Sequence, residues 1–351
     1  MRHHVILPLA LAAASLVATR GEAQRTERFT LDGSRVAVYN LAGEVRVEPG
    51  SGSEVVVEVT RGGSDAGELR VREGETDGAA SLVVLYPDDR VVYPRMGRGS
   101  NTEMSVERDG TFGRSGRVLG GRRVRIHGSG SGTEAWADLR VLVPAGRTVS
   151  VNQAVGRVEV SNVHGDLRVR GAAASIHALG TRGSLNLDTG SGGIEVRDAQ
   201  GEIVLDTGSG GVRVSGVSGP RLSVDTGSGG VVGSGLDVEN LHVDVGSGGV
   251  RLDAVDARDI LIDTGSGSVE LSLRGDVNRA RIDTGSGGVT LGVPAGFGAE
   301  LDIDTGSGGI DVDVPATVRR AGRSHFTGTI GDGNGRVEID TGSGGVRVRR
   351  S

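Results

Sequence analysis

A five-residue motif, Asp-Thr-Gly-Ser-Gly or Asp-Val-Gly-Ser-Gly, recurs along the C-terminal half of this sequence and sets strict limits on its fold. The intervals between successive copies are 18, 19, 19, 19, 20, 21 and 36 residues. The eight copies begin at Asp188, Asp206, Asp225, Asp244, Asp263, Asp283, Asp304 and Asp340. A period of about 20 residues is typical of architectures in which one small unit stacks on the next.

Apolar residues occupy fixed positions around each motif aspartate, namely −3, −1, +6 and +8 counted from the Asp. In the first copy these positions hold Leu185, Leu187, Ile194 and Val196. The residues between them are mostly polar or charged, so the pattern predicts two short strands per copy, each with one buried face. The same pattern without the Asp surrounds Asn152 and Arg170, which makes ten copies in all.

Two turns close each copy, one of them Thr-Gly-Ser-Gly-Gly in most copies and the other variable. Glycine is expected in these turns because it adopts positive φ readily. Asp and Ser side chains are expected to accept hydrogen bonds from nearby backbone N–H groups. The motif aspartates are therefore predicted to cap the turns.

Two all-β architectures fit this pattern. In a parallel β-solenoid, about ten coils of 18–21 residues stack so that like residues lie on like, following a β-rich N-terminal region. In an antiparallel meander or barrel, each turn would instead be a hairpin. The solenoid is favoured, because a flat meander leaves one apolar face uncovered, while a coil buries its inward side chains against each other.

The chain divides into four segments by composition. They are a signal peptide at 1–23, an N-terminal β-rich region or cap at 24–89, an Arg/Gly-rich loop insertion at 90–135, and the solenoid repeats at 136–351, with an insertion at 315–336. The first segment has an early Arg2, an apolar run and small residues before position 24, as secretory signals do. Its apolar run is shorter than the roughly 20 residues of a membrane span. We therefore expect export to the periplasm, cell surface or medium, with no transmembrane segment after cleavage.

The segment 90–132 carries nine Arg and only three acidic residues, together with many Gly and Ser. This composition is typical of a mobile surface loop. A basic patch for anionic glycans, lipopolysaccharide phosphate or nucleic acid is the alternative, although charge runs are usually solvated.

Composition narrows the classes of partner. The net charge is −6, which argues against nucleic acid as a partner, since nucleic-acid binding requires a basic surface. Aromatic residues make up 2% of the chain, so stacking platforms for sugars or bases are scarce. There is no Cys, and stability must come from packing, backbone pairing or bound ions.

The motif also resembles the Asp-Thr-Gly-Ser signature of aspartic proteases. Such enzymes need two aspartates that share one proton, whereas eight copies at regular spacing indicate a structural turn. No catalytic and no cofactor-binding residue is predicted. Five scattered histidines show no ligand spacing, so no metal-ligating residue is predicted either; they are His127, His164, His177, His242 and His325.

Calcium is nevertheless a possibility for this chain. In a solenoid, the aspartates from Asp188 through Asp304 would stack about 4.8 Å apart and repel one another. Carboxylate oxygens are ligands that Ca²⁺ accepts. Turn capping by these aspartates is the favoured interpretation, and a Ca²⁺ ladder is the alternative.

Three elements carry a resemblance to a known family: the strand-turn-strand Val36–Val47, the strand Leu139–Pro144, and the coils with Thr-Gly-Ser-Gly turns. Together they resemble the bacterial β-strand-repeat family of "putative adhesins", a domain of unknown function. The resemblance implies adhesion at the cell surface and supplies no catalytic residues.

The expected function follows from these observations. We expect an exported, non-enzymatic repeat scaffold, an adhesin-like structural or binding module of the cell envelope or surface. Its partners would be envelope or surface glycans or proteins. The alternatives are a polysaccharide-active β-helix enzyme and a calcium-dependent adhesion module.

Overall fold

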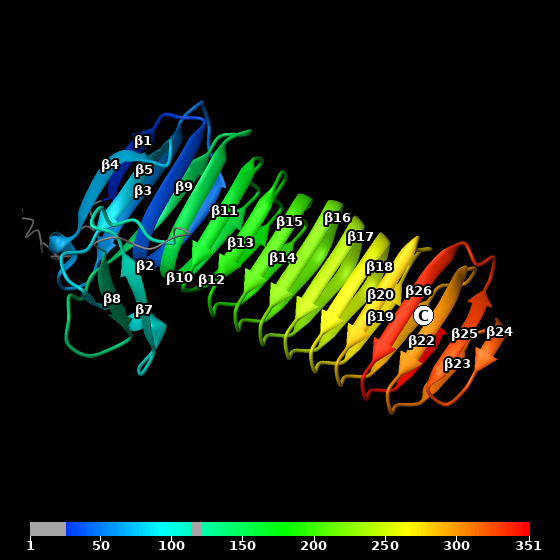
Figure 1. Ribbon diagram of the computed structural model, residues 1–351. Coiled ribbons are helices and arrows are strands. Elements are labelled where there is room, and N and C mark those ends of the chain that lie inside the picture. The colour runs from blue at the N-terminus through cyan, green and yellow to red at the C-terminus, as the bar shows by residue number, and fades with distance from the viewer. Residues whose placement is uncertain (1–25, 114–120) are drawn as a thin grey trace, which may run out of the picture.

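The computed structural model describes residues 26–113 and 121–351, so the expected signal peptide lies outside the described residues. Within these ranges the chain forms 27 β-strands and two short 3₁₀ helices. Figure 1 shows an elongated stack of strands, with the first strands at one end and β22 to β25 at the other. The all-β prediction is confirmed. Among these residues, no helix has the length and apolar character needed to cross a membrane.

Each repeat is one coil with two arms. In the motif copies the first arm ends just after the motif Asp, and the second arm follows the Gly-rich turn. First-arm strands are β11 (Asp166–Gly171), β13 (Leu185–Thr189), β15 (Gln200–Thr207), β20 (Arg279–Thr284), β22 (Ala299–Thr305) and β26 (Gly335–Thr341). Second-arm strands are β12 (Ala173–Leu179), β14 (Ile194–Arg197), β19 (Val269–Leu273), β21 (Val289–Val293), β23 (Ile310–Asp313) and β27 (Val346–Arg350). Four long strands contribute to both arms: β10 (Thr148–Ser161), β16 (Val212–Thr226), β17 (Val231–Val245) and β18 (Val250–Thr264).

Consecutive coils pair in parallel and in register. Leu185 lies opposite Ile203, and Asp188 lies opposite Asp206. The parallel prediction is therefore confirmed, and the antiparallel meander is wrong for the repeats. The physical reason is burial: the residues at −3, −1, +6 and +8 of the first copy are at most 2% exposed, because the two arms of a coil face each other across one hydrophobic core.

The C-terminal coil is not the last coil in space. Strand β26 pairs in parallel with β20 on one side and with β22 on the other. Strand β27 lies in the same way between β21 and β23. Figure 1 shows β26 in red between β20 and β22. The chain thus passes one coil position, turns back and fills the position it left open, so stacking in sequence order is wrong at this end.

The insertion 315–336 contains the hairpin that makes this return possible. Strands β24 (Ala316–Ala321) and β25 (His325–Ile330) pair antiparallel, and β25 also pairs antiparallel with β22. The hairpin covers the outer edge of β22. Covering the open edge of a sheet in this way prevents other chains from adding to it.

The opposite end is also closed by antiparallel strands. Strand β2 (Arg35–Pro49) forms a coil in parallel register with β10, although paired residues such as Val36 and Val149 are 113 positions apart in sequence (149 − 36). Beyond it, β9 (Trp136–Val143) and β5 (Ala79–Leu85) pair in parallel with its two halves. Strand β3 (Val55–Gly62) pairs antiparallel with β9 and covers its edge, and β1 (Thr26–Leu31) pairs antiparallel with β3. Strand β4 (Arg70–Thr76) covers the edge of β5 in the same way.

The described residues of the segment predicted as a loop, 90–113 and 121–135, instead contain regular strands. These are β6 (Arg90–Val92), β7 (Asn101–Val106) and β8 (Arg122–His127), which form a separate three-stranded sheet. A 3₁₀ helix (Pro94–Met96) follows β6, and another (Ala66–Glu68) precedes β4. The loop prediction was wrong because Val124 and Ile126 alternate with arginines and are fully buried, so the Arg-rich composition hid a strand pattern of period two.

Candidate functional site: an aspartate column and its ends

The motif aspartates form one column on the outer face of the first arms. Each Asp lies opposite the Asp of the neighbouring strand, at the spacing of about 4.8 Å between adjacent strands. Because the last coil is inserted, the order along the stack is Asp188, Asp206, Asp225, Asp244, Asp263, Asp283, Asp340 and Asp304. Eight like charges are therefore aligned along the stack.

The aspartates do not cap the turns, contrary to the prediction from sequence. In four of the copies, the hydroxyl of the motif Thr accepts the hydrogen bond from the turn, whereas in the last three coils of the stack it donates to a carbonyl of its own turn. The Oγ1 atom of Thr207 accepts from the N–H of Gly210 at 3.1 Å and donates to the carbonyl of Gly192 in the preceding coil at 2.9 Å. Thr226 and Thr264 make the equivalent pair of bonds. The buried Thr closes the turn, and the Asp side chain points outward.

Partial burial and mutual repulsion act together on the carboxylates of this column. Desolvation raises the pKa of Asp206, Asp225 and Asp263 above the ordinary value of 3.8, and the neighbouring aspartates of the column raise it further. Both effects disfavour the charged form of the carboxyl group. The column therefore stores unfavourable electrostatic energy at neutral pH.

On the second arm, charged residues of adjacent coils form ion pairs. Arg251 lies opposite Glu270 in register, and the two form an ion pair at 2.7 Å. Asp311 and Arg347 are paired in the same way at 3.0 Å. Opposite charges thus face each other at these two places on the second arm, whereas the aspartate column of the first arm stacks like charges. The column is therefore a continuous row of like charges along one face of the stack.

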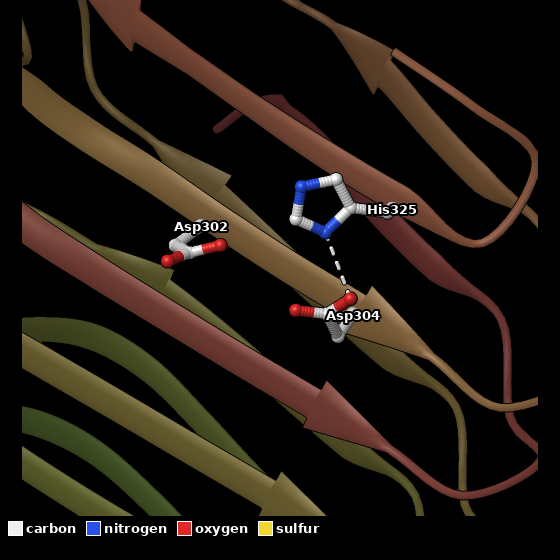
Figure 2. A group of neighbouring side chains, drawn as sticks. All are labelled: Asp302, Asp304 and His325. Carbon is white, nitrogen blue, oxygen red and sulfur yellow. Dashed lines mark hydrogen bonds and ion pairs between the residues drawn. The ribbon is translucent and has the colours of Figure 1, made fainter. Parts of the chain in front are cut away.

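The two ends of the column carry different neighbours. Arg170 lies opposite Asp188 at the N-terminal end. At the other end, His325 of β25 lies opposite Asp304, and its Nδ1 is 2.8 Å from the Asp304 carboxylate. Asp302 is on the same face of β22, and Figure 2 shows the two carboxylates beside the imidazole ring. Ligand atoms of these three residues all lie within 4.8 Å of one another.

A groove runs beside the middle of the column. Its volume is about 580 Å³, and it lies on the outer face of the first arms of β16, β17, β18 and β20. Its lining includes the polar side chains of Arg221, Asn240, His242, Asp259 and Arg281, and the side chain of Leu261, which is 42% exposed. This combination of hydrogen-bond donors and acceptors with an apolar surface suits a polar ligand that also presents an apolar face.

Replacing Asp225 by Asn is expected to stabilise the protein at pH 7 by up to about 1 kcal/mol, because it removes the repulsion between this exposed carboxylate and its like-charged neighbours in the column. The raised pKa in the folded state means that the charged form opposes folding. This penalty is present at neutral pH and disappears as the pH falls through the raised folded pKa toward the unfolded value of 3.8. The stabilisation should therefore shrink on acidification and in 1 M salt, as measured by urea unfolding.

The control for this prediction is Asp253→Asn, which removes an exposed acid that lies outside the column. An equal gain in stability from the control would contradict column repulsion as the cause. So would a gain that persists unchanged at pH 3.

The sequence predicted no metal-ligating residue among the five histidines. His127, His164, His177 and His242 lie on separate strands or turns, but His325 meets two motif-strand aspartates. No sequence signal could have indicated this cluster, because His325 is 21 residues from Asp304 and reaches it through an antiparallel hairpin within an insertion. A search for the short ligand spacings of known metal-binding motifs would therefore not find these three residues.

Comparisons with known proteins bear on the family of the chain. The Toastrack DUF4097 family matches residues 42–349. A solved structure from Clostridium sporogenes ATCC 15579, described as "a putative cell adhesion protein", shares 10% identity, with 93% of this chain and 99% of that chain covered and a TM-score of 0.21. A TM-score this low does not establish a shared arrangement of the two chains, so nothing about this chain follows from it. No curated protein matches significantly.

The family match covers the repeats, the C-terminal closure and most of the N-terminal closure, but not β1. It begins within β2, the first coil of the stack, and ends within β27, the inserted last coil. The chain therefore belongs to the Toastrack DUF4097 family, a domain of unknown function, which confirms the family resemblance predicted from its strand repeats.

Proposed function

We propose that this protein is an exported, non-enzymatic, adhesin-like scaffold of the bacterial cell envelope or surface, built as a β-solenoid. The observation that supports this best is the continuous parallel register, which runs from β2 through every motif coil to β22. Such a stack is rigid, since each coil is held by backbone pairing on both sides. It presents long faces of repeated side chains, which suit binding to extended partners.

The outer face of the first arms is the proposed binding surface. It carries the groove of about 580 Å³ and, beside it, the aspartate column. Arg221 and His242 offer donors in the groove, and Leu261 offers an apolar surface. A glycan of the envelope or cell surface has hydroxyl groups and apolar ring faces that match this lining. We therefore propose glycans as the partner class, with proteins as the alternative.

Calcium-dependent adhesion is the second candidate function, and the column of like charges favours it. Stacked carboxylates, few of which have a cationic partner, form a hard-cation surface, because Ca²⁺ takes oxygen ligands. In this version, Ca²⁺ would lower the repulsion along the column and bridge it to an anionic partner. Binding that is lost in a chelator and restored by Ca²⁺ distinguishes this candidate from direct glycan binding.

The experiment is a binding screen of the protein against a panel of bacterial-envelope and host-surface glycans, repeated with and without chelator. The double variant Arg221→Ser/His242→Ser is expected to lose at least tenfold in affinity for the best ligand. Arg213→Ser is the matched control, because Arg213 is an exposed arginine on the second arm and outside the groove. Equal binding by the groove variant would refute the proposed surface, and turnover of any glycan would refute the non-enzymatic role.

A further inference from the structure

The cluster at the C-terminal end of the aspartate column differs chemically from the column itself. Asp302 and Asp304 are two residues apart on β22 and so project from the same face of the strand. His325 begins β25 and lies opposite Asp304 in antiparallel register. The cluster therefore combines two carboxylates with an imidazole, and it joins the last first-arm strand to the hairpin that covers it (Figure 2).

Neighbouring acids at this end have arginine partners, and the cluster acids do not. Glu300 is paired with Arg319 at 2.6 Å. Glu338, which lies opposite Asp302, is held by Arg279 at 2.9 Å, and Arg336 also contacts it. Within the described residues, Asp302 has no ion pair or hydrogen bond from its side chain, and Asp304 has only His325. No arginine side chain neutralises the carboxylates of Asp302 and Asp304 among the described residues, so both are available to a bound cation.

We propose that Asp302, Asp304 and His325 bind a divalent transition metal of the zinc class. The imidazole decides the class of metal: Zn²⁺ accepts nitrogen together with carboxylate oxygen, whereas Ca²⁺ and Mg²⁺ are bound almost entirely by oxygen. Three protein ligands leave a fourth position of a tetrahedral site open to water or to a ligand from outside. Binding joins β22 to β25 and so fastens the hairpin to the stack.

A second pair in the same protein shows what the site requires. His177 and Glu195 lie in register on the second arm, with His177 Nδ1 3.2 Å from the carboxylate. That carboxylate is already held by Arg197, and there is no second free acid among the described neighbours. A histidine beside one neutralised carboxylate is not a metal site by this chemistry, so His177 supplies the matched control.

The test is calorimetric titration of Zn²⁺ into the untagged, chelator-treated protein, with Ca²⁺ in a parallel titration. We expect one saturable Zn²⁺ site, a rise in the thermal midpoint on zinc addition, and slower proteolysis within residues 316–330. His325→Gln and Asp304→Asn should each weaken Zn²⁺ binding at least tenfold, while His177→Gln leaves it unchanged. Circular dichroism of the metal-free variants should match that of the unsubstituted protein, so that lost binding is not lost folding.

Three results would overturn the proposal. They are the absence of saturable Zn²⁺ binding up to millimolar concentration, Zn²⁺ binding that His325→Gln leaves unchanged, and Ca²⁺ binding at the cluster as tight as that of Zn²⁺. Loss of the site would leave the proposed glycan-binding groove untouched, since the groove lies on other coils.

Discussion

Replacing Gly210 by alanine is expected to destabilise the protein by about 3 kcal/mol, while the same substitution at the adjacent Gly211 changes stability by less than about 1 kcal/mol. The difference lies in what the new methyl group would meet. At Gly210 it would be 1.9 Å from the carbonyl oxygen of Gly192 in the preceding coil. At Gly211 its nearest neighbour would be 3.6 Å away, which is ordinary van der Waals contact.

The contact at Gly210 involves backbone, so no side-chain rotation can relieve it. The stack must separate locally, and the pairing between two coils is weakened on both sides of the turn. Urea unfolding of both variants measures the effect as a difference in midpoint. Similar midpoints for Gly210→Ala and Gly211→Ala would show that the turns do not approach as closely as the structure indicates.

The same contact recurs along the stack, and it changes the meaning of the repeated glycines. Gly229, Gly248 and Gly267 would each place a methyl group 1.8–2.1 Å from a carbonyl oxygen of the preceding coil. The expectation from sequence was that these glycines supply positive φ, but positive φ is found elsewhere, as at Gly201 and Gly219 in the variable turns. The motif glycines are needed because the turns stack at close range.

Local patterning was sufficient to predict the core of the repeats. The apolar residues at −3, −1, +6 and +8 were placed inside from their alternation alone, and residues such as Leu187 and Val196 are fully buried. The turn chemistry was predicted less well, because Asp and Thr can both accept hydrogen bonds in a turn. Which of them does so depends on which side chain points inward, and the strand parity directs Thr207 inward and Asp206 outward.

The composition of the segment 90–135 obscured its three-stranded sheet, and the histidine cluster depends on contacts that no local pattern encodes. Gly and Arg dominate the composition of this segment, although Val124 and Ile126 bury it as a strand. The cluster depends on the path of the chain through the hairpin that precedes β26. The repeat pattern therefore places the aspartates of the candidate metal site, whereas the position of His325 beside them depends on the long-range pairing of β25 with β22.

A cysteine pair at positions 283 and 340 is expected to form a disulfide and to stabilise the protein by roughly 4 kcal/mol, as estimated for a closed loop of this length. Asp283 and Asp340 lie opposite each other on β20 and β26. Adjacent strands are about 4.8 Å apart, which is within the Cα separation that a disulfide spans. The chain has no native Cys, so oxidation of Asp283→Cys/Asp340→Cys reports on this one contact.

The matched control is Asp283→Cys/Asp304→Cys, which also removes two aspartates from the column. In the structure these positions are separated by β26, so they are about 9.6 Å apart and beyond the reach of a disulfide. Stacking in sequence order would reverse both outcomes, since 283 and 304 would then be neighbours. Gel mobility after oxidation distinguishes the two arrangements.

The aspartate motifs cannot decide between these arrangements, because every motif presents the same Asp, Thr and Gly to its neighbours. Asp340 stacks equally well on Asp283 or beyond Asp304, and the strand pairing is the same in kind. What differs is the closing of the end: in the observed order the hairpin of β24 and β25 covers β22, and His325 meets Asp304. A cross-link between 283 and 304 would therefore refute the inserted coil and, with it, the geometry that positions the proposed metal site.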